Sequence, residues 1–160
     1  MAAGRIGEVL HRAEAFLAAT LLVAMVGLIF AGGVARMMAT PINWTIDFAT
    51  CFFAWATFLA ADVAWRRDAL MSVDLLPNAL PERWRRGLRL VNVALIAAFL
   101  VFLIVAGAWL TWVSRSRSFQ GIPEISFSFV TASLPVGAAL LLVTTLTKAR
   151  RMIAAPHEAA

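Results

Sequence analysis

Two carboxylates, Asp47 and Asp62, lie within one apolar stretch of the 160-residue chain, residues 44–65. An ionisable side chain in an apolar medium is costly, and by default it marks a functional site such as an ion path or a polar contact. At 100° per residue, their separation of 15 positions leaves the two acids about 60° apart on a helix, on one face with Cys51, Trp55 and Phe58. We therefore expect this face to contact a partner protein.

A second interpretation of the two acids needs no partner. Asp47 lies three residues after Trp44, and Asp62 lies three residues before Trp65, so both carboxylates can reach polar surroundings at the ends of the stretch. Arg66, four residues after Asp62, also offers an ion pair at helical spacing. The sequence leaves both interpretations open.

Other chemically active residues are sparse. The two histidines, His11 and His157, lie near opposite ends of the chain, which leaves no pair to ligate a haem inside an apolar region. Cys51 is the single cysteine, so it can form no internal disulfide or metal cluster, and we expect it to be a small packing residue. The sequence contains no phosphate loop, nucleophile elbow or zinc motif. We therefore predict neither an enzyme nor a resident cofactor.

The composition and hydropathy of the chain predict a membrane protein. Hydrophobic residues make up 62% of it and charged residues 14%, which differs from a soluble domain. Apolar runs of about 20 residues can cross a hydrocarbon core about 30 Å thick, and they occur here at residues 15–35, 44–65, 90–113 and 127–146. The first run exceeds the roughly 7 to 15 apolar residues of a signal peptide, so we expect a span there. The predicted fold is an all-α integral membrane protein with one four-helix domain, residues 1–160.

The distribution of basic residues predicts the orientation of these spans. With four crossings, the N-terminal segment, the loop between the second and third spans, and the C-terminal tail share one side of the membrane. That side carries eleven Lys and Arg residues against three on the other. Because cytoplasmic loops are enriched in Lys and Arg, we expect both termini in the cytoplasm and the chain in a bacterial inner membrane.

Aromatic and basic residues also predict contacts with lipid. Trp44 and Trp65 are 21 residues apart, or about 31 Å along a helix, close to the hydrocarbon thickness. Apolar residues recur at helical spacing over residues 80–90, which predicts a short amphipathic helix in the interface between the second and third spans. The predicted lipid-interface residues are Trp44, Trp65, Trp84, Arg85, Arg86 and Arg89. Although the pI is about 11.3, the basic residues follow the topology, so lipid headgroups rather than nucleic acid are the expected partners.

Three features bear on how the helices pack. Gly27, Ala31 and Ala35 recur every four residues, a pattern that permits close approach of two helices. Pro135 lies inside the fourth span and lacks an amide proton, so we predict a kink there. Trp55 lies near the middle of the second span, where it either fills space among helices and lipid or contacts another subunit.

The order of several short motifs resembles a known family over nearly the whole chain. The motifs are Trp44 with an acid three residues later, FFAWATFLAADVAWRR at residues 52–67, Val73 and Asp74 followed by LPNALP, GIPEISFSF at residues 121–129, and LPVG at residues 134–137. This combination is similar to the small membrane subunit of tripartite ATP-independent periplasmic (TRAP) transporters, the DctQ type. Three positions depart from the family pattern: Asp47 stands where Glu is common, Ala60 where Gly is common, and Leu70 where His is common.

The resemblance implies a subunit of a larger machine. In such systems a periplasmic substrate-binding protein captures an organic acid, and a large multi-span subunit moves it inward by an elevator motion driven by sodium. The small subunit would bind and anchor the large one. The positions on the family pattern or on the acidic face of the second span are the candidates for that contact: Asp47, Trp55, Asp62, Arg66, Arg67 and Asp74.

Other classes of membrane protein remain as alternatives. The small subunit of tripartite tricarboxylate transporters has a similar size and four spans. Small multidrug exporters are shorter and place a Glu deep in the first helix, whereas this chain has no acid between Glu14 and Asp47. A lipid-binding or assembly protein without a transport partner is the third alternative.

Overall fold

The computed structural model describes residues 2–67 and 82–154, and long helices dominate both segments. The helices are α1 (Ala2–Met37), α2 (Trp44–Arg66), α4 (Glu82–Val113), the single turn α5 (Ser128–Thr131) and α6 (Ser133–Ala154), with a 3-10 turn η1 (Ser114–Ser116) after α4. Within these residues four helical stretches are long and apolar enough to cross a membrane: His11–Met37, Trp44–Arg66, Leu90–Ser116 and Ser128–Arg150. The predicted all-α fold with four membrane-spanning stretches is confirmed.

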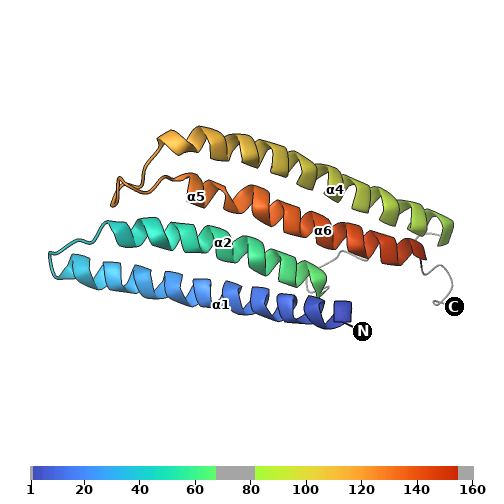
Figure 1. Cartoon of the computed structure of the whole chain (residues 1–160), viewed down its shortest axis with the longest axis horizontal. Coiled ribbons are helices and arrows are strands. Elements are labelled where there is room, and N and C mark those ends of the chain that lie inside the picture. Colours follow the sequence, from blue (N-terminus) through green and yellow to red (C-terminus); the bar gives the residue numbers. More distant parts are fainter. Residues whose placement is uncertain (1, 68–81, 155–160) are drawn as a thin grey trace.

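The long helices form a flat row rather than a closed bundle (Figure 1). The order across the row is α1, α2, α6 and α4, with α5 continuing the line of α6. α1 and α4 are the outer members, and within the described residues each packs on one long neighbour only. One end of the row carries the start of α1, the end of α2, the start of α4 and the end of α6. We call it the terminal end, and the opposite end, which carries residues 38–43 and 117–127, the loop end.

The interfacial helix predicted over residues 80–90 is not a separate element where the structure describes this region. α4 begins at Glu82 and continues without interruption to Val113. Residues 80 and 81 lie outside the described residues. A position of the first turns of α4 in the membrane interface, like the orientation of the termini, stays a prediction.

Helix α1 ends in a local motif that turns the chain toward α2. The amide of Thr40 donates to the carbonyl of Ala35 at 3.0 Å, and the amide of Ala39 donates to the carbonyl of Arg36 at 3.2 Å. This pattern is the Schellman motif, which needs a residue in the left-handed region after the helix, and Ala39 has φ 57°. Pro41 follows and cannot continue the helix.

Replacing Ala39 with glycine is expected to stabilise the protein by about 1 kcal/mol. Glycine has no Cβ and adopts positive φ at little steric cost, whereas the left-handed conformation costs an L-residue about 1–2 kcal/mol. Thermal unfolding of the purified chain in detergent, followed by tryptophan fluorescence, measures the effect. Ala39→Val is the opposing control and should lower the unfolding midpoint; an unfolding midpoint higher for the valine variant than for glycine would contradict the motif.

Close approach of the helices depends on small residues, but of the predicted series only Ala35 is buried. A Cβ added at Gly27 meets no atom within 4 Å, and Ala31 is exposed. The close approach of α1 to α2 occurs instead at Gly32, where an added Cβ would lie 2.5 Å from Oγ1 of Thr45. Helical spacing alone identified small residues, but it did not show which side of α1 faces α2.

The helix interruption near Pro135 lies one turn before the proline. α5 ends at Thr131 and α6 begins at Ser133. Because proline has no amide proton, it cannot donate to the carbonyl of Thr131, four residues earlier. This break in hydrogen bonding does not show whether the helix axis bends, so the kink at Pro135 stays a prediction.

Candidate functional site

The second acid of α2 lies at the centre of a polar network at the terminal end. Asp62 has 0% of its surface exposed. Its Oδ1 accepts a hydrogen bond from the hydroxyl of Thr144 on α6 at 2.7 Å, and its Oδ2 pairs with the guanidinium of Arg66 one helical turn later. Both carboxylate oxygens therefore have partners, as a buried charge requires. The predicted i,i+4 ion pair is confirmed.

Arg66 extends this network to the first helix. Its Nη2 donates to Oε2 of Glu14 at 2.8 Å, and its Nη1 contacts Nδ1 of His11. The five N–H donors of a guanidinium fork can serve several acceptors at once. Arg66 therefore ties α2 to α1, while Asp62 ties α2 to α6, and the network joins three of the four long helices.

Trp65 adds a second connection between α2 and α6. Its indole Nε1 donates to Oγ1 of Thr145 at 3.1 Å, and the ammonium of Lys148 lies 4.8 Å from the centre of its ring. Lys148 also donates to the backbone carbonyl of Trp65. The indole N–H of Trp65 therefore bonds to α6. A contact of its ring with lipid headgroups stays a prediction.

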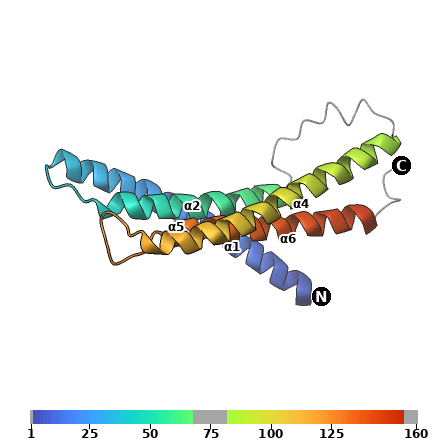
Figure 2. The same cartoon turned by 90° about the horizontal axis from the view of Figure 1, so that it is seen from above.

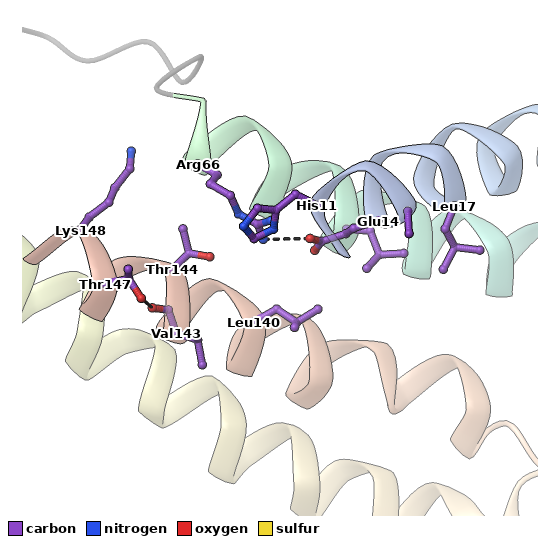
Figure 3. A pocket seen from close by; sticks show the side chains of 11 residues that line it. His11, Glu14, Leu17, Arg66, Leu140, Val143, Thr144, Thr147 and Lys148 are labelled. Carbon is purple, nitrogen blue, oxygen red and sulfur yellow. Dashed lines mark hydrogen bonds and ion pairs between the residues drawn. The ribbon is translucent and has the colours of Figure 1, made fainter. Parts of the chain in front are cut away.

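A cavity of about 680 Å³ lies beside the network. Figure 3 shows His11, Glu14 and Leu17 of α1 on one side and Leu140, Val143, Thr144, Thr147 and Lys148 of α6 on the other. Where the structure describes them, α1 and α6 do not pack against each other, and the N-terminal part of α1 diverges from α6 in the turned view (Figure 2). Within residues 2–67 and 82–154, no group of three or more His, Cys, Asp or Glu residues is placed to hold a metal.

The first acid of α2 holds a loop at the loop end. Oδ2 of Asp47 accepts a hydrogen bond from the backbone amide of Gly121 at 2.6 Å. A Cβ at Gly121 would lie 2.5 Å from Cα of Trp44, so only glycine allows the loop to approach the start of α2 this closely. The loop folds back on itself, with the amide of Phe119 donating to Ile125 at 3.0 Å. The Trp44 and GIPE motifs therefore meet in space.

The acidic face of α2 packs on the second half of the same chain. Nε1 of Trp55 donates to the carbonyl of Phe129 at 3.0 Å, and Phe58 occupies the space beside Gly137. Cys51 is half-buried on this face. The face that we expected to contact a partner protein thus contacts α5 and α6 in this structure. A contact of Asp47, Trp55 or Asp62 with another subunit stays a prediction.

The remaining predicted residues are only partly described. Arg67 is exposed at the end of α2, and Trp44 is 42% exposed at its start, where lipid or protein can reach it. Asp74 lies outside the described residues. The structure describes only the backbone of Trp84, Arg85, Arg86 and Arg89, in the first turns of α4.

Sequence reasoning missed the partners that Asp62 and Arg66 find on other helices. Glu14 is 52 residues from Arg66, and Thr144 is 82 residues from Asp62. The available signals were an acid at the entry to the first span and the adjacent threonines 144 and 145 in an otherwise apolar run. Neither signal indicates which residue the side chain faces.

The chain matches the family model described as tripartite ATP-independent periplasmic transporters, DctQ component, over residues 25–155. It is 33% identical over 109 residues to the C4-dicarboxylate TRAP transporter small permease protein DctQ of Vibrio cholerae serotype O1, which is 68% of this chain and 47% of that protein. It is 27% identical over 134 residues to the sialic acid TRAP transporter permease protein SiaT of Haemophilus influenzae (strain 86-028NP), which is 83% of this chain and 22% of that protein. The matched regions therefore span about half and about a fifth of these two relatives.

Proposed function

Because the chain belongs to the DctQ family of TRAP transporter components, we propose that it is the small membrane subunit that binds and anchors a large transport subunit. The observation that carries this proposal is the family match over residues 25–155, which includes α2, α4 and α6 and the second half of the apolar part of α1. The family consists of transporter subunits, so the chain has a role in transport rather than in catalysis. The resemblance drawn from the sequence motifs is confirmed, and the three alternative classes lose their support.

The shape of the chain supports a role as part of a larger membrane assembly. The outer helices α1 and α4 expose large apolar side chains along their lengths, for example Phe16 at 75% and Phe102 at 63%. In a bilayer these side chains face lipid or another membrane protein. A flat row of helices offers a partner more surface than a closed four-helix bundle of the same length.

The longer relative supports the identity of the partner. A region similar to this chain makes up 22% of the sialic acid TRAP transporter permease protein SiaT. A small-subunit region and further permease sequence therefore occur in one polypeptide there. We propose that this chain binds a separate large permease subunit, and that a periplasmic substrate-binding protein supplies the complex.

The transported molecule is proposed to be an organic acid. Two relatives are named for C4-dicarboxylate and for sialic acid, and both compounds are carboxylates. Sodium-driven movement by an elevator mechanism would belong to the large subunit, and this chain would supply its static support. We further propose a bacterial inner membrane location with both termini in the cytoplasm, which the excess of Lys and Arg at the terminal end supports.

The structure suggests two ways in which the candidate residues serve this contact. Arg67 is exposed and can touch the large subunit directly; Asp74 is proposed for the same role from the family pattern. Asp47 and Trp55 have partners within the chain, so we propose that they act by holding α2 against the loop and α5. Asp62 and Arg66 would act in the same way at the terminal end.

Substitution of Asp47 or Trp55 with alanine is expected to lower recovery of the large subunit at least threefold when the tagged small subunit is purified from membranes that contain both. Each change removes one hydrogen bond between α2 and residues 121–129. The position of α2 in the row is then held less firmly, and so is the surface that the large subunit would bind. Uptake of the organic acid bound by the associated binding protein should fall in parallel.

The matched control is Thr50→Ala on the same helix. Thr50 is exposed and its hydroxyl bonds only to the carbonyl of Ile46 among the described residues, so this change should leave recovery unaltered. Recovery and uptake equal to the control for both Asp47→Ala and Trp55→Ala would refute their role. Failure to recover any large subunit with the wild-type chain would refute the proposed function itself.

A further inference from the structure

We propose that the cavity between α1 and α6 binds one aminophospholipid, whose ammonium group contacts Glu14 and whose acyl chain lies along the apolar wall (Figure 3). The proposal concerns the membrane leaflet that meets the terminal end of the row. It goes beyond anchoring of the large subunit and does not depend on it.

The size and wall of the cavity suit a lipid. At about 680 Å³ it falls within the usual range of small-molecule sites, about 300–1,000 Å³. Leu17 of α1, Leu59 of α2, and Leu140 and Val143 of α6 line it. These side chains come from three helices inside the predicted spans, so the apolar part of the cavity lies at the depth of acyl chains rather than of water.

The polar end of the cavity contains both signs of charge. Arg66 and Lys148 are cationic, and Glu14 is acidic. The buried Asp62 also pairs with Arg66. The ammonium of Lys148 lies on the carbonyl and ring of Trp65 at the same end. The polar end therefore carries a carboxylate beside cationic side chains, which matches a zwitterion better than a simple anion.

Glu14 carries the clearest sign of a missing donor. Its Oε2 accepts from Arg66, whereas its Oε1 is buried and has no hydrogen-bond partner among the described residues. A buried acceptor without a donor is unfavourable. An ammonium headgroup supplies positively charged N–H donors to this oxygen, and such charge-assisted hydrogen bonds are the stronger kind.

The other parts of the lipid then have matching surroundings. With the ammonium on Glu14, the phosphate lies in the positive field of Lys148 and Arg66, and the acyl chain follows the leucines. An anionic glycerol headgroup brings no cation for Glu14. A helix of the large subunit could pack against the apolar wall, but its backbone would bring no cationic group to Glu14.

The test uses the full chain, purified in detergent and delipidated, with phosphatidylethanolamine or phosphatidylglycerol of identical acyl chains added. Native mass spectrometry measures the bound lipid. We expect one bound phosphatidylethanolamine per chain and at least a fivefold preference over phosphatidylglycerol. Glu14→Gln should abolish the preference, because a neutral amide offers no ion pair. Glu124→Gln, which removes the same charge from the exposed loop, should retain it.

A second pair of variants tests the location without relying on Glu14. Val143→Trp fills the cavity and should lower phosphatidylethanolamine binding at least fivefold, since Val143 lines it. Val136→Trp lies seven residues earlier on the same side of α6 and outside the lining, so it should have no effect. Val143 is 63% exposed and Val136 43% exposed, so both changes are tolerable for folding. If Glu14→Gln fails to fold, the valine pair decides the result.

Three outcomes would overturn the proposal. These are equal binding of the two lipids to the wild-type chain, unchanged binding in Val143→Trp, and loss of the lipid when the large subunit is co-purified. The last would show that the partner, and not a lipid, occupies the cavity. The first two outcomes are measured on the isolated chain. The lipid site can therefore be refuted while the large subunit is still recovered, so the lipid site and the proposed function are tested separately.

Discussion

Asp62→Ala is expected to lower the free energy of unfolding by about 3 kcal/mol, the low end for breaking a buried ion pair, because Arg66 keeps its pair with Glu14. The change leaves Arg66 without its nearest carboxylate and Thr144 without its acceptor. Both groups lie among packed helices inside predicted spans, where water compensates poorly for a lost partner. Thermal or denaturant unfolding of the full chain in detergent, followed by tryptophan fluorescence, measures the loss.

A double-mutant cycle separates the ion pair from other effects of the substitution. If the cost arises from Arg66 losing its nearest carboxylate, then Asp62→Ala combined with Arg66→Leu should be less destabilising than the sum of the single changes. Glu124→Ala is the control, since this acid is exposed in the loop. An Asp62→Ala variant as stable as Glu124→Ala would show that the network at the terminal end contributes little to the fold.

Gly137→Ala is expected to cost about 1–3 kcal/mol, the range for an added methyl group in a well-packed interface. The new Cβ would clash with Cβ and Cγ of Phe58 and would lie 2.6 Å from its Cδ1. Since Phe58 is on α2 and Gly137 is on α6, the clash separates the two central helices of the row. Unfolding of the same detergent-solubilised chain provides the measurement.

Two comparisons sharpen the glycine experiment. Gly27→Ala adds the same methyl group where nothing lies within 4 Å, so it should be neutral or stabilising by up to about 1 kcal/mol from helix propensity. Phe58→Ala removes the ring and should partly relieve Gly137→Ala. Equal effects of the two glycine substitutions would show that α2 and α6 are not in close contact at Phe58 and Gly137.

Recovery of the large subunit adds a functional measure to both experiments. Asp62 and Gly137 each set how α2 lies against α6. If the large subunit binds the row as a whole, then both substitutions should lower its recovery in proportion to the loss of stability. If it binds only an outer helix, recovery should survive a modest shift between the central pair.

Properties of the chain that depend on near neighbours were predictable from residue order. Long apolar runs predict the four spans, because a bilayer accepts only segments whose backbone bonds are satisfied internally. The pairing of Asp62 with Arg66 follows from their i,i+4 spacing. The family motifs, read in order, predict the small-subunit identity that the family match confirms.

The arrangement of the helices depends on contacts that residue order does not contain. Three hydrogen bonds join residues that are far apart in the sequence. Their separations are 74 residues for Asp47 and Gly121, 52 for Arg66 and Glu14, and 82 for Asp62 and Thr144. In a bilayer, apolar side chains gain little by choosing protein over lipid, so a few polar pairs and close approaches decide which helices are neighbours. Hydropathy therefore predicts four crossings, whereas only the three-dimensional structure shows that they form an open row, that the acidic face of α2 is used within the chain, and that a cavity beside Glu14 remains.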